Sequence, residues 1–134
     1  MIAVDTSVVV AAFATWHDRH AAARAVVDSG ARLVAHCAME SYSVLTRLPP
    51  PHRAPADVVS EFLATRFSDS WLALPSKSCV NLISRLAATG IVGGSTYDAL
   101  VGATAAHSGA TLATCDSRAL RIYDAVGAKY RLVE

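Results

Sequence analysis

Four acidic residues of this chain, Asp5, Glu40, Asp98 and Asp116, have the chemical type and spacing that suit a metal site. Carboxylate and water oxygens are the ligands that hard divalent cations such as Mg²⁺ and Mn²⁺ prefer. Four carboxylates held together would repel one another strongly, and a bound cation would remove that cost. If the fold brings the four together, the sequence predicts a divalent-metal site suited to phosphodiester chemistry.

Short apolar segments alternate with helical segments along the chain, which predicts a parallel β-sheet covered by helices on both faces. The predicted strands are residues 2–4, 32–35, 71–74, 111–114 and 130–133. The predicted helices are residues 6–13, 18–28, 38–47, 55–68, 76–89, 95–108 and 117–126. We therefore expect an α/β fold in one domain, residues 1–134, because a chain of this length suits a single domain.

This order of elements places the four acids at one edge of the predicted sheet. Asp5 and Asp116 follow the first and fourth strands, and Glu40 comes a few residues after the second, at the start of a helix. Asp98 lies in the first turn of a helix that runs antiparallel to the strands and leads into the fourth. Ligands of parallel α/β sheets bind beyond the carboxyl ends of the strands, where all four acids are expected.

Helix capping is the alternative interpretation of each acid. Asp5 and Asp116 precede helices and can act as N-caps. Ser95 and Asp98 have the spacing of a capping box, and Glu40 in a first helical turn would be favoured by the helix dipole. Capping explains each acid singly, but it does not explain why all four lie at strand ends of the same polarity.

The composition limits the classes of function. Hydrophobic residues make up 53% of the 134 residues, which excludes a disordered chain. The net charge of +1 gives no overall basic signature, so any contact with nucleic acid must be local. Cys37, Cys79 and Cys115 are widely spaced without a CxxC pair, which predicts reduced thiols and a cytoplasmic protein. No apolar stretch approaches the roughly 18 residues of a membrane span.

The segments around the four acids resemble those of PIN-domain ribonucleases, and in particular the VapC toxins of bacterial type II toxin–antitoxin modules. The matching segments are IAVDTSVVVAAF (2–13), AMESYSVLTRLPPPHR (38–53), GGSTYDALVGATAAHSGATLAT (93–114) and CDSRALRIYDAVG (115–127). The resemblance implies a three-layer α/β/α domain with a five-stranded parallel sheet. It also implies a Mg²⁺-dependent endoribonuclease, with Mn²⁺ as a substitute.

The resemblance assigns metal-binding and catalytic roles to all four acids. We expect Asp5 and Asp98 to anchor the main metal ion. Glu40 and Asp116 are expected to position a second ion or to orient the attacking water. In-line attack on RNA would leave a 5′-phosphate and a 3′-hydroxyl.

Three hydroxyl side chains are expected to hold these carboxylates by hydrogen bonds, although ordinary cap chemistry explains them equally well. Thr6 and Ser7 follow the first acid, and Thr114 precedes the last. Many family members carry a further acid three positions after the fourth, where this chain has Ala119. A second metal position is therefore expected to be weaker here.

Local cations are the expected contacts for RNA phosphates. Arg47 and Arg53 follow the Glu40 helix, and Arg118 follows Asp116. Three aromatic side chains could stack on a base, although packing against the protein is the alternative for each: Trp16, Tyr42 and Tyr97.

The resemblance also implies partners. A cognate VapB antitoxin would cover the apolar surface of residues 6–28 and 36–68, and the chain would form a homodimer. Two other functions remain open from the residues: a catalytically inactive module that binds RNA or antitoxin, and a receiver-like signalling domain that binds Mg²⁺. The receiver would need a phosphoacceptor Asp after the third strand, where this chain has Pro75.

Overall fold

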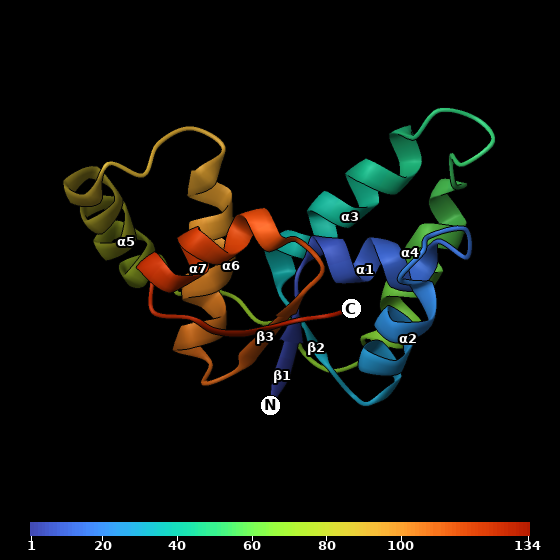
Figure 1. The fold of residues 1–134 in the computed structure, drawn as a ribbon, viewed down its shortest axis with the longest axis horizontal. Helices are drawn as coiled ribbons and strands as arrows, with labels where there is room; N and C mark the ends of the chain where they lie inside the picture. The colour runs from blue at the N-terminus through green and yellow to red at the C-terminus, as the bar shows by residue number, and fades with distance from the viewer.

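Four parallel strands form the sheet at the centre of the fold, in the order β2-β1-β3-β4 (Figure 1). The structure is a computed structural model that describes every residue from Met1 to Glu134. The strands are β1 (Ile2–Val4), β2 (Arg32–Leu33), β3 (Thr111–Thr114) and β4 (Lys129–Leu132). Because every pair of strands is parallel, their carboxyl ends lie at the same edge of the sheet.

The two central strands, β1 and β3, are largely buried because helices cover both of their faces. Val4 of β1 and Ala113 of β3 are completely buried. In the register of the sheet, Val4 pairs with Leu33 of β2 on one side and with Ala113 on the other. The next residue, Asp5, therefore emerges at the middle of the carboxyl edge, where its amide donates to the carbonyl of Ala113 over 3.3 Å.

The helices form two groups, one on each side of the sheet (Figure 1). In the first group α1 contacts α2 and α3, and α3 contacts α4; in the second, α6 contacts α5 and α7. The bounds are α1 (Thr6–Phe13), α2 (His20–Asp28), α3 (Ala35–Arg47), α4 (Ala56–Arg66), α5 (Ser76–Thr89), α6 (Ser95–His107), the 3₁₀ turn η1 (Ser117–Ala119) and α7 (Leu120–Ala125). The predicted α/β class is therefore confirmed.

The predicted strand at residues 71–74 was wrong, so the sheet has four strands rather than five. Only Leu72 pairs with the sheet, through a single parallel bridge to Val34. Leu72 is buried, while Trp71 and Ala73 on either side of it are exposed. Leu74 packs against the α5–α7 helices and does not pair with the sheet. Pro75 follows closely and lacks the amide that would extend the pairing.

The largest difference at a helix boundary concerns α3, which begins at Ala35, three residues before the predicted start. Its N-cap, Val34, has extended backbone and forms no side-chain capping bond, so the sequence carries no start signal at this point. Glu40 was predicted to lie in the first turn of this helix, but it consequently lies in the second turn of α3. The other predicted boundaries lie within two residues of the observed ones.

The core is divided unequally between the two groups of helices. One cluster of 30 buried residues joins the sheet to α1–α4 and extends to Tyr123 of α7. A second cluster of six buried residues holds α5 against α6 and α7: Leu82, Leu86, Ala99, Ala103, Ile122 and Val126. The helices that flank the carboxyl ends of β1 and β3, namely α1, α6 and α7, are therefore firmly packed.

The cysteines are all free, with Cys37 and Cys115 buried and Cys79 only partly covered. Burial raises the pKa of the Cys37 and Cys115 thiols, which keeps them protonated and unreactive. None of the helices has both the length and the apolar character needed to cross a bilayer.

Gly102 allows α6 to approach the segment that follows α7. A β-carbon at this position would lie 2.7 Å from Cγ2 of Val126 and 3.1 Å from Cδ1 of Tyr123. Both neighbours are buried, so neither side chain can move away freely.

We therefore expect Gly102→Ala to lower the free energy of unfolding by about 1–2 kcal/mol, because overpacking outweighs the gain in helix propensity. Urea unfolding would measure the change. Gly94→Ala is the matched control, since a β-carbon there meets nothing within 4 Å and the backbone already has φ −61°. Equal stabilities of the two variants would contradict the proposed packing role of Gly102.

Candidate metal centre

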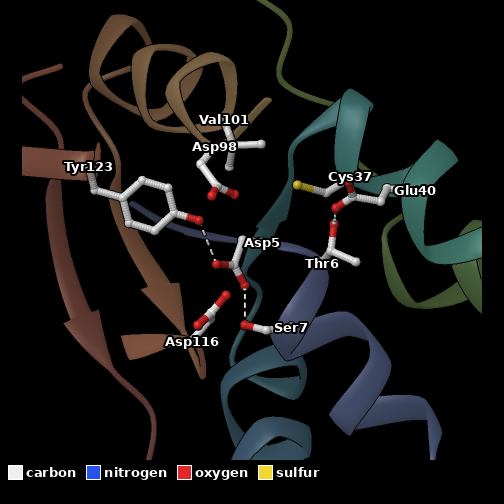
Figure 2. A pocket seen from close by; sticks show the side chains of 9 residues that line it. All are labelled: Asp5, Thr6, Ser7, Cys37, Glu40, Asp98, Val101, Asp116 and Tyr123. Atoms are coloured by element: carbon white, nitrogen blue, oxygen red, sulfur yellow. Dashed lines mark hydrogen bonds between the residues drawn. The ribbon is translucent and has the colours of Figure 1, made fainter. Parts of the chain in front are cut away.

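A pocket of about 210 Å³ opens at the carboxyl edge of the sheet, and all four predicted acids line it. Figure 2 shows their carboxylates turned toward a common space, with Asp98 extending from α6 and Glu40 from α3. The remaining lining residues are Thr6, Ser7, Cys37, Val101 and Tyr123. Every charged residue in this lining is acidic, so the pocket concentrates negative charge.

Asp5 is the most deeply held of the four, with only 4% of its surface exposed. It is the N-cap of α1: its Oδ1 accepts from the amide of Val8 at 3.3 Å and from Oγ of Ser7 at 2.5 Å. Its Oδ2 accepts from the Tyr123 hydroxyl at 2.7 Å (Figure 2). Burial raises the pKa of Asp5, although these hydrogen bonds act in the opposite direction.

Asp98 lies in the first turn of α6 and is partly buried. Desolvation raises its pKa, and the charges of Asp116, Glu40 and Asp5 raise it further, in that order. The other three carboxylates are therefore close enough to Asp98 to disfavour its ionised form. This mutual repulsion is the electrostatic property that a bound cation would relieve.

Glu40 faces the pocket from α3, and Oγ1 of Thr6 donates to its Oε1 over 2.5 Å. His36, one turn earlier in α3, has its Nε2 3.8 Å from the other carboxylate oxygen. The contact with Thr6 joins α3 to the start of α1, so the orientation of Glu40 depends on the residue that follows Asp5.

Asp116 is the N-cap of η1, where its Oδ1 accepts from the amide of Arg118 at 3.0 Å. Its own amide donates to Oγ1 of Thr114 over 3.0 Å. Ser7 lies 3.3 Å from the Thr114 hydroxyl and accepts from the Cys115 amide at 2.8 Å. Ser7 and Thr114 thus connect the segments that carry Asp5 and Asp116.

Capping accounts for only two of the four acids. Asp5 and Asp116 are caps, as the alternative interpretation predicted. The predicted capping box of Ser95 and Asp98 was wrong, because Gly94 is the N-cap of α6 and no side chain caps that helix. Glu40 lies beyond the first turn of α3 and caps nothing. Capping therefore does not explain why Glu40 faces the pocket.

The donor set fits a hard divalent cation, because it consists of carboxylate oxygens with hydroxyl groups behind them. No three of the Asp, Glu, His or Cys side chains lie close enough together to enclose one ion by themselves. The acids thus form the walls of an open pocket rather than a closed cage. This arrangement suits Mg²⁺, which usually takes one or two protein carboxylates and keeps several waters.

The PIN domain family matches residues 2–125 of the chain, a span that contains all four acids. The chain belongs to the PIN-domain family. It is 50% identical over 133 residues to Ribonuclease VapC40 of Mycobacterium tuberculosis, with 99% of each chain covered. It is also 43% identical over 128 residues to Ribonuclease VapC27 of the same organism, with 94% of this chain and 92% of that one covered.

Within the family this PIN domain is of the VapC type. The predicted resemblance is therefore confirmed, and the receiver-like alternative was wrong.

The predicted phosphate-binding cations of this PIN domain lie at different places. Arg118 extends beside the pocket, with its Nε 3.4 Å from Oδ1 of Asp116 and its side chain almost fully exposed. Arg47 donates to Ser43 on α3, and Arg53 donates to the carbonyl of Leu48. Neither lines the pocket. The structure therefore brings only Arg118 of the three to the acidic residues.

Two residues at the centre of this PIN domain were not predicted. Tyr123 holds Asp5 although 118 residues separate them, and its sequence context is that of any apolar helix residue. Arg19 donates from Nη1 to the carbonyl of Cys115 over 2.9 Å, which places a guanidinium beside the segment carrying Asp116. Both contacts arise from tertiary packing, so no local sequence signal could have identified them.

We expect Asp5→Asn to stabilise the metal-free PIN domain at neutral pH, because burial makes the ionised form of Asp5 costly in the folded state. The pKa of Asp5 in the folded state lies above its ordinary value of 3.8. At a pH between the ordinary pKa of Asp5 and its higher pKa in the folded protein, the folded state binds more protons than the unfolded state. The free energy of unfolding therefore falls as pH rises through this window. The asparagine of the variant does not titrate, so the variant does not lose stability in this way as pH rises.

Urea unfolding in EDTA from about pH 4 to pH 8 would measure the difference between Asp5→Asn and the unsubstituted protein. It should be near zero at the acidic end and grow as pH rises. Asp69→Asn is the control, because Asp69 is exposed in a loop and its replacement leaves the interior unchanged. A variant less stable than the unsubstituted protein at every pH would contradict the cost assigned to the buried charge.

Proposed function

We propose that this chain is a metal-dependent endoribonuclease that hydrolyses RNA phosphodiester bonds. The observation that carries the proposal is the convergence of four carboxylates from separate elements on one pocket. Two of the four, Glu40 and Asp98, have no capping role that would explain their position. The names of the relatives VapC40 and VapC27, both ribonucleases, support RNA as the substrate.

The proposed cofactor is Mg²⁺, with Mn²⁺ as a substitute. When bound, such an ion lowers the pKa of water and neutralises charge on the phosphoryl group. In the proposal Asp5 and Asp98 hold the ion, while Glu40 and Asp116 position a second ion or orient the attacking water. Ala119, where a fifth acid could have extended the site, is buried in the core.

The surrounding hydroxyl groups keep the carboxylates in position for this chemistry. Thr6 fixes one oxygen of Glu40, and Ser7 and Tyr123 each fix one oxygen of Asp5. A carboxylate restrained on one side presents its remaining lone pairs in a constant direction. We propose that Arg118 contacts a phosphate of the bound RNA at the edge of the pocket.

We also propose that the chain is the toxin of a type II toxin–antitoxin module in the cytoplasm, with a VapB-type antitoxin as its inhibitor. An apolar groove of about 340 Å³ between α3 and α4 supports such a partner, and it is lined by Ala38, Met39, Tyr42, Ser60, Leu63, Ala64 and Trp71. An exposed groove of this composition is typical of protein interfaces. Homodimerisation is proposed through helical faces, supported by exposed Val80 and Ile83 on α5.

We expect Asp5→Asn and Asp98→Asn each to lower the rate of Mg²⁺-dependent RNA cleavage by about 100-fold or more, because each removes an ionic ligand. The measurement is cleavage of labelled RNA, with EDTA as the metal-free reference. Sequencing the new 5′ ends would identify the bonds that are cut.

Asp57→Asn is the matched control for Asp98→Asn. Both acids lie in the first turn of a helix, but Asp57 is exposed on α4 and outside the pocket. It should keep full activity. Full activity in both pocket variants would refute the assignment of the site, and RNA that stays intact with the unsubstituted protein would indicate the inactive module instead.

We expect Ala64→Glu to weaken binding of the antitoxin by at least about 10-fold while RNA cleavage is unchanged, because it places a charge in the apolar groove. Calorimetry with the purified antitoxin would measure the affinity. Ala88→Glu, on an exposed face of α5, is the control. Equal affinities for the two variants would place the antitoxin elsewhere. The solution mass of the chain alone would test the homodimer.

A further inference from the structure

Two aromatic rings stack across the space between the helices that carry Glu40 and Asp98. The rings of His36 and Tyr97 are parallel within 1°, and their centroids are 5.3 Å apart. His36 lies one turn before Glu40 on α3, and Tyr97 directly precedes Asp98 on α6. The stack therefore joins α3 to α6. Figure 2 shows the acids of these two helices, Glu40 and Asp98, entering the pocket from different sides.

The two rings have different exposures. His36 is mostly covered, and its Nε2 is buried without a hydrogen-bond partner, 3.8 Å from Oε2 of Glu40. Tyr97 remains 53% exposed although His36 covers part of it. A large planar side chain thus lies next to Asp98, with one ring packed against it and about half of its surface open to solvent.

The charge of the pocket makes such a surface useful for binding RNA. Four carboxylates carry more negative charge than one bound divalent ion offsets, so the pocket attracts RNA phosphates only weakly. Arg118 is the one Arg or Lys side chain that forms an ion pair with any of the four acids. Stacking of a base on an aromatic ring does not depend on phosphate charge and is tolerant of sequence. It can hold a nucleotide where electrostatic attraction is weak.

We propose that Tyr97, positioned by His36, is the stacking platform for the nucleobase beside the scissile phosphate of single-stranded RNA. This inference rests on the proposed ribonuclease function and adds the part of the substrate that the protein grips next to the acids. Tyr97 contacts the base, and His36 acts only through Tyr97.

A second pair of rings in the chain provides a matched control. Trp16 packs against His52 with ring centroids 4.2 Å apart and planes tilted by 38°, and it is 50% exposed. It follows the far end of α1, so the helix, about 12 Å long, separates it from Asp5. Trp16 has the same kind of neighbour and similar exposure, but it does not adjoin the acidic residues.

The test uses short oligoribonucleotides in which one base at a time is 2-aminopurine, whose fluorescence falls when it stacks. Binding is measured in Mg²⁺ with Asp5→Asn, which removes one carboxylate and slows cleavage. We expect quenching at one position. Adding Tyr97→Leu should abolish the quenching and weaken binding about 5- to 100-fold. Adding Tyr97→Phe or Trp16→Leu should leave both unchanged.

Two further readouts separate stacking from general damage. The dependence of binding on salt should keep its slope in Tyr97→Leu, because no phosphate contact is lost. In the otherwise unsubstituted enzyme, Tyr97→Leu should raise the KM for RNA. Tyr97→Phe, which keeps an aromatic ring, should have the KM of the unsubstituted enzyme.

Cleavage of RNA by the unsubstituted enzyme with no quenching at any position, or with quenching lost in Trp16→Leu instead, would overturn the platform and leave the ribonuclease function intact. Absence of both cleavage and RNA binding would remove the proposed function, and the platform with it.

Discussion

An acidic side chain is held inside the protein at the end of β1, one of the two central strands, and the neighbouring structure is arranged to hold it. Asp5 follows β1, which has strands on both sides, so its carboxylate has little access to water. A buried carboxylate without partners would be strongly disfavoured. Here Ser7, Val8 and Tyr123 supply three hydrogen bonds from α1 and α7. The packing of these two helices against the sheet and the position of the charge thus depend on each other.

The same arrangement sets stability against function. Asp98 and Asp5 both have raised pKa values, Asp5 through burial and Asp98 through partial burial and the charge of the other acids. Ionised forms of these groups cost stability, yet a cation site requires them. Apolar replacement would relieve the repulsion and remove the chemistry. Such conflicts are expected where residues are retained for activity rather than for folding.

Local patterns allowed the sequence to predict Asp5 and Asp116, because each acid follows an apolar strand and precedes a helix. Asp98 and Glu40 needed the additional rule that antiparallel helices begin at the carboxyl edge of a parallel sheet, and the start of α3 was still misplaced because Val34 gives no capping signal. The contacts of Tyr123 and Arg19, and the pairing of Tyr97 with His36, could not be predicted, since they join distant segments. Tyr97 itself was named from the sequence as a side chain that could stack on a base. The single bridge at Leu72 shows the same limit for strands: pairing depends on neighbours that the segment itself does not specify.

The uneven division of the core has a consequence for motion. Only Leu82 and Leu86 of α5 are buried, and the helix is held by a cluster of six residues separate from the main core. Segments with few buried apolar contacts open at lower free energy than the rest of a protein. The amide hydrogens of α5 should therefore exchange with solvent through local opening, while β1, β3 and α1 exchange only when the whole chain unfolds.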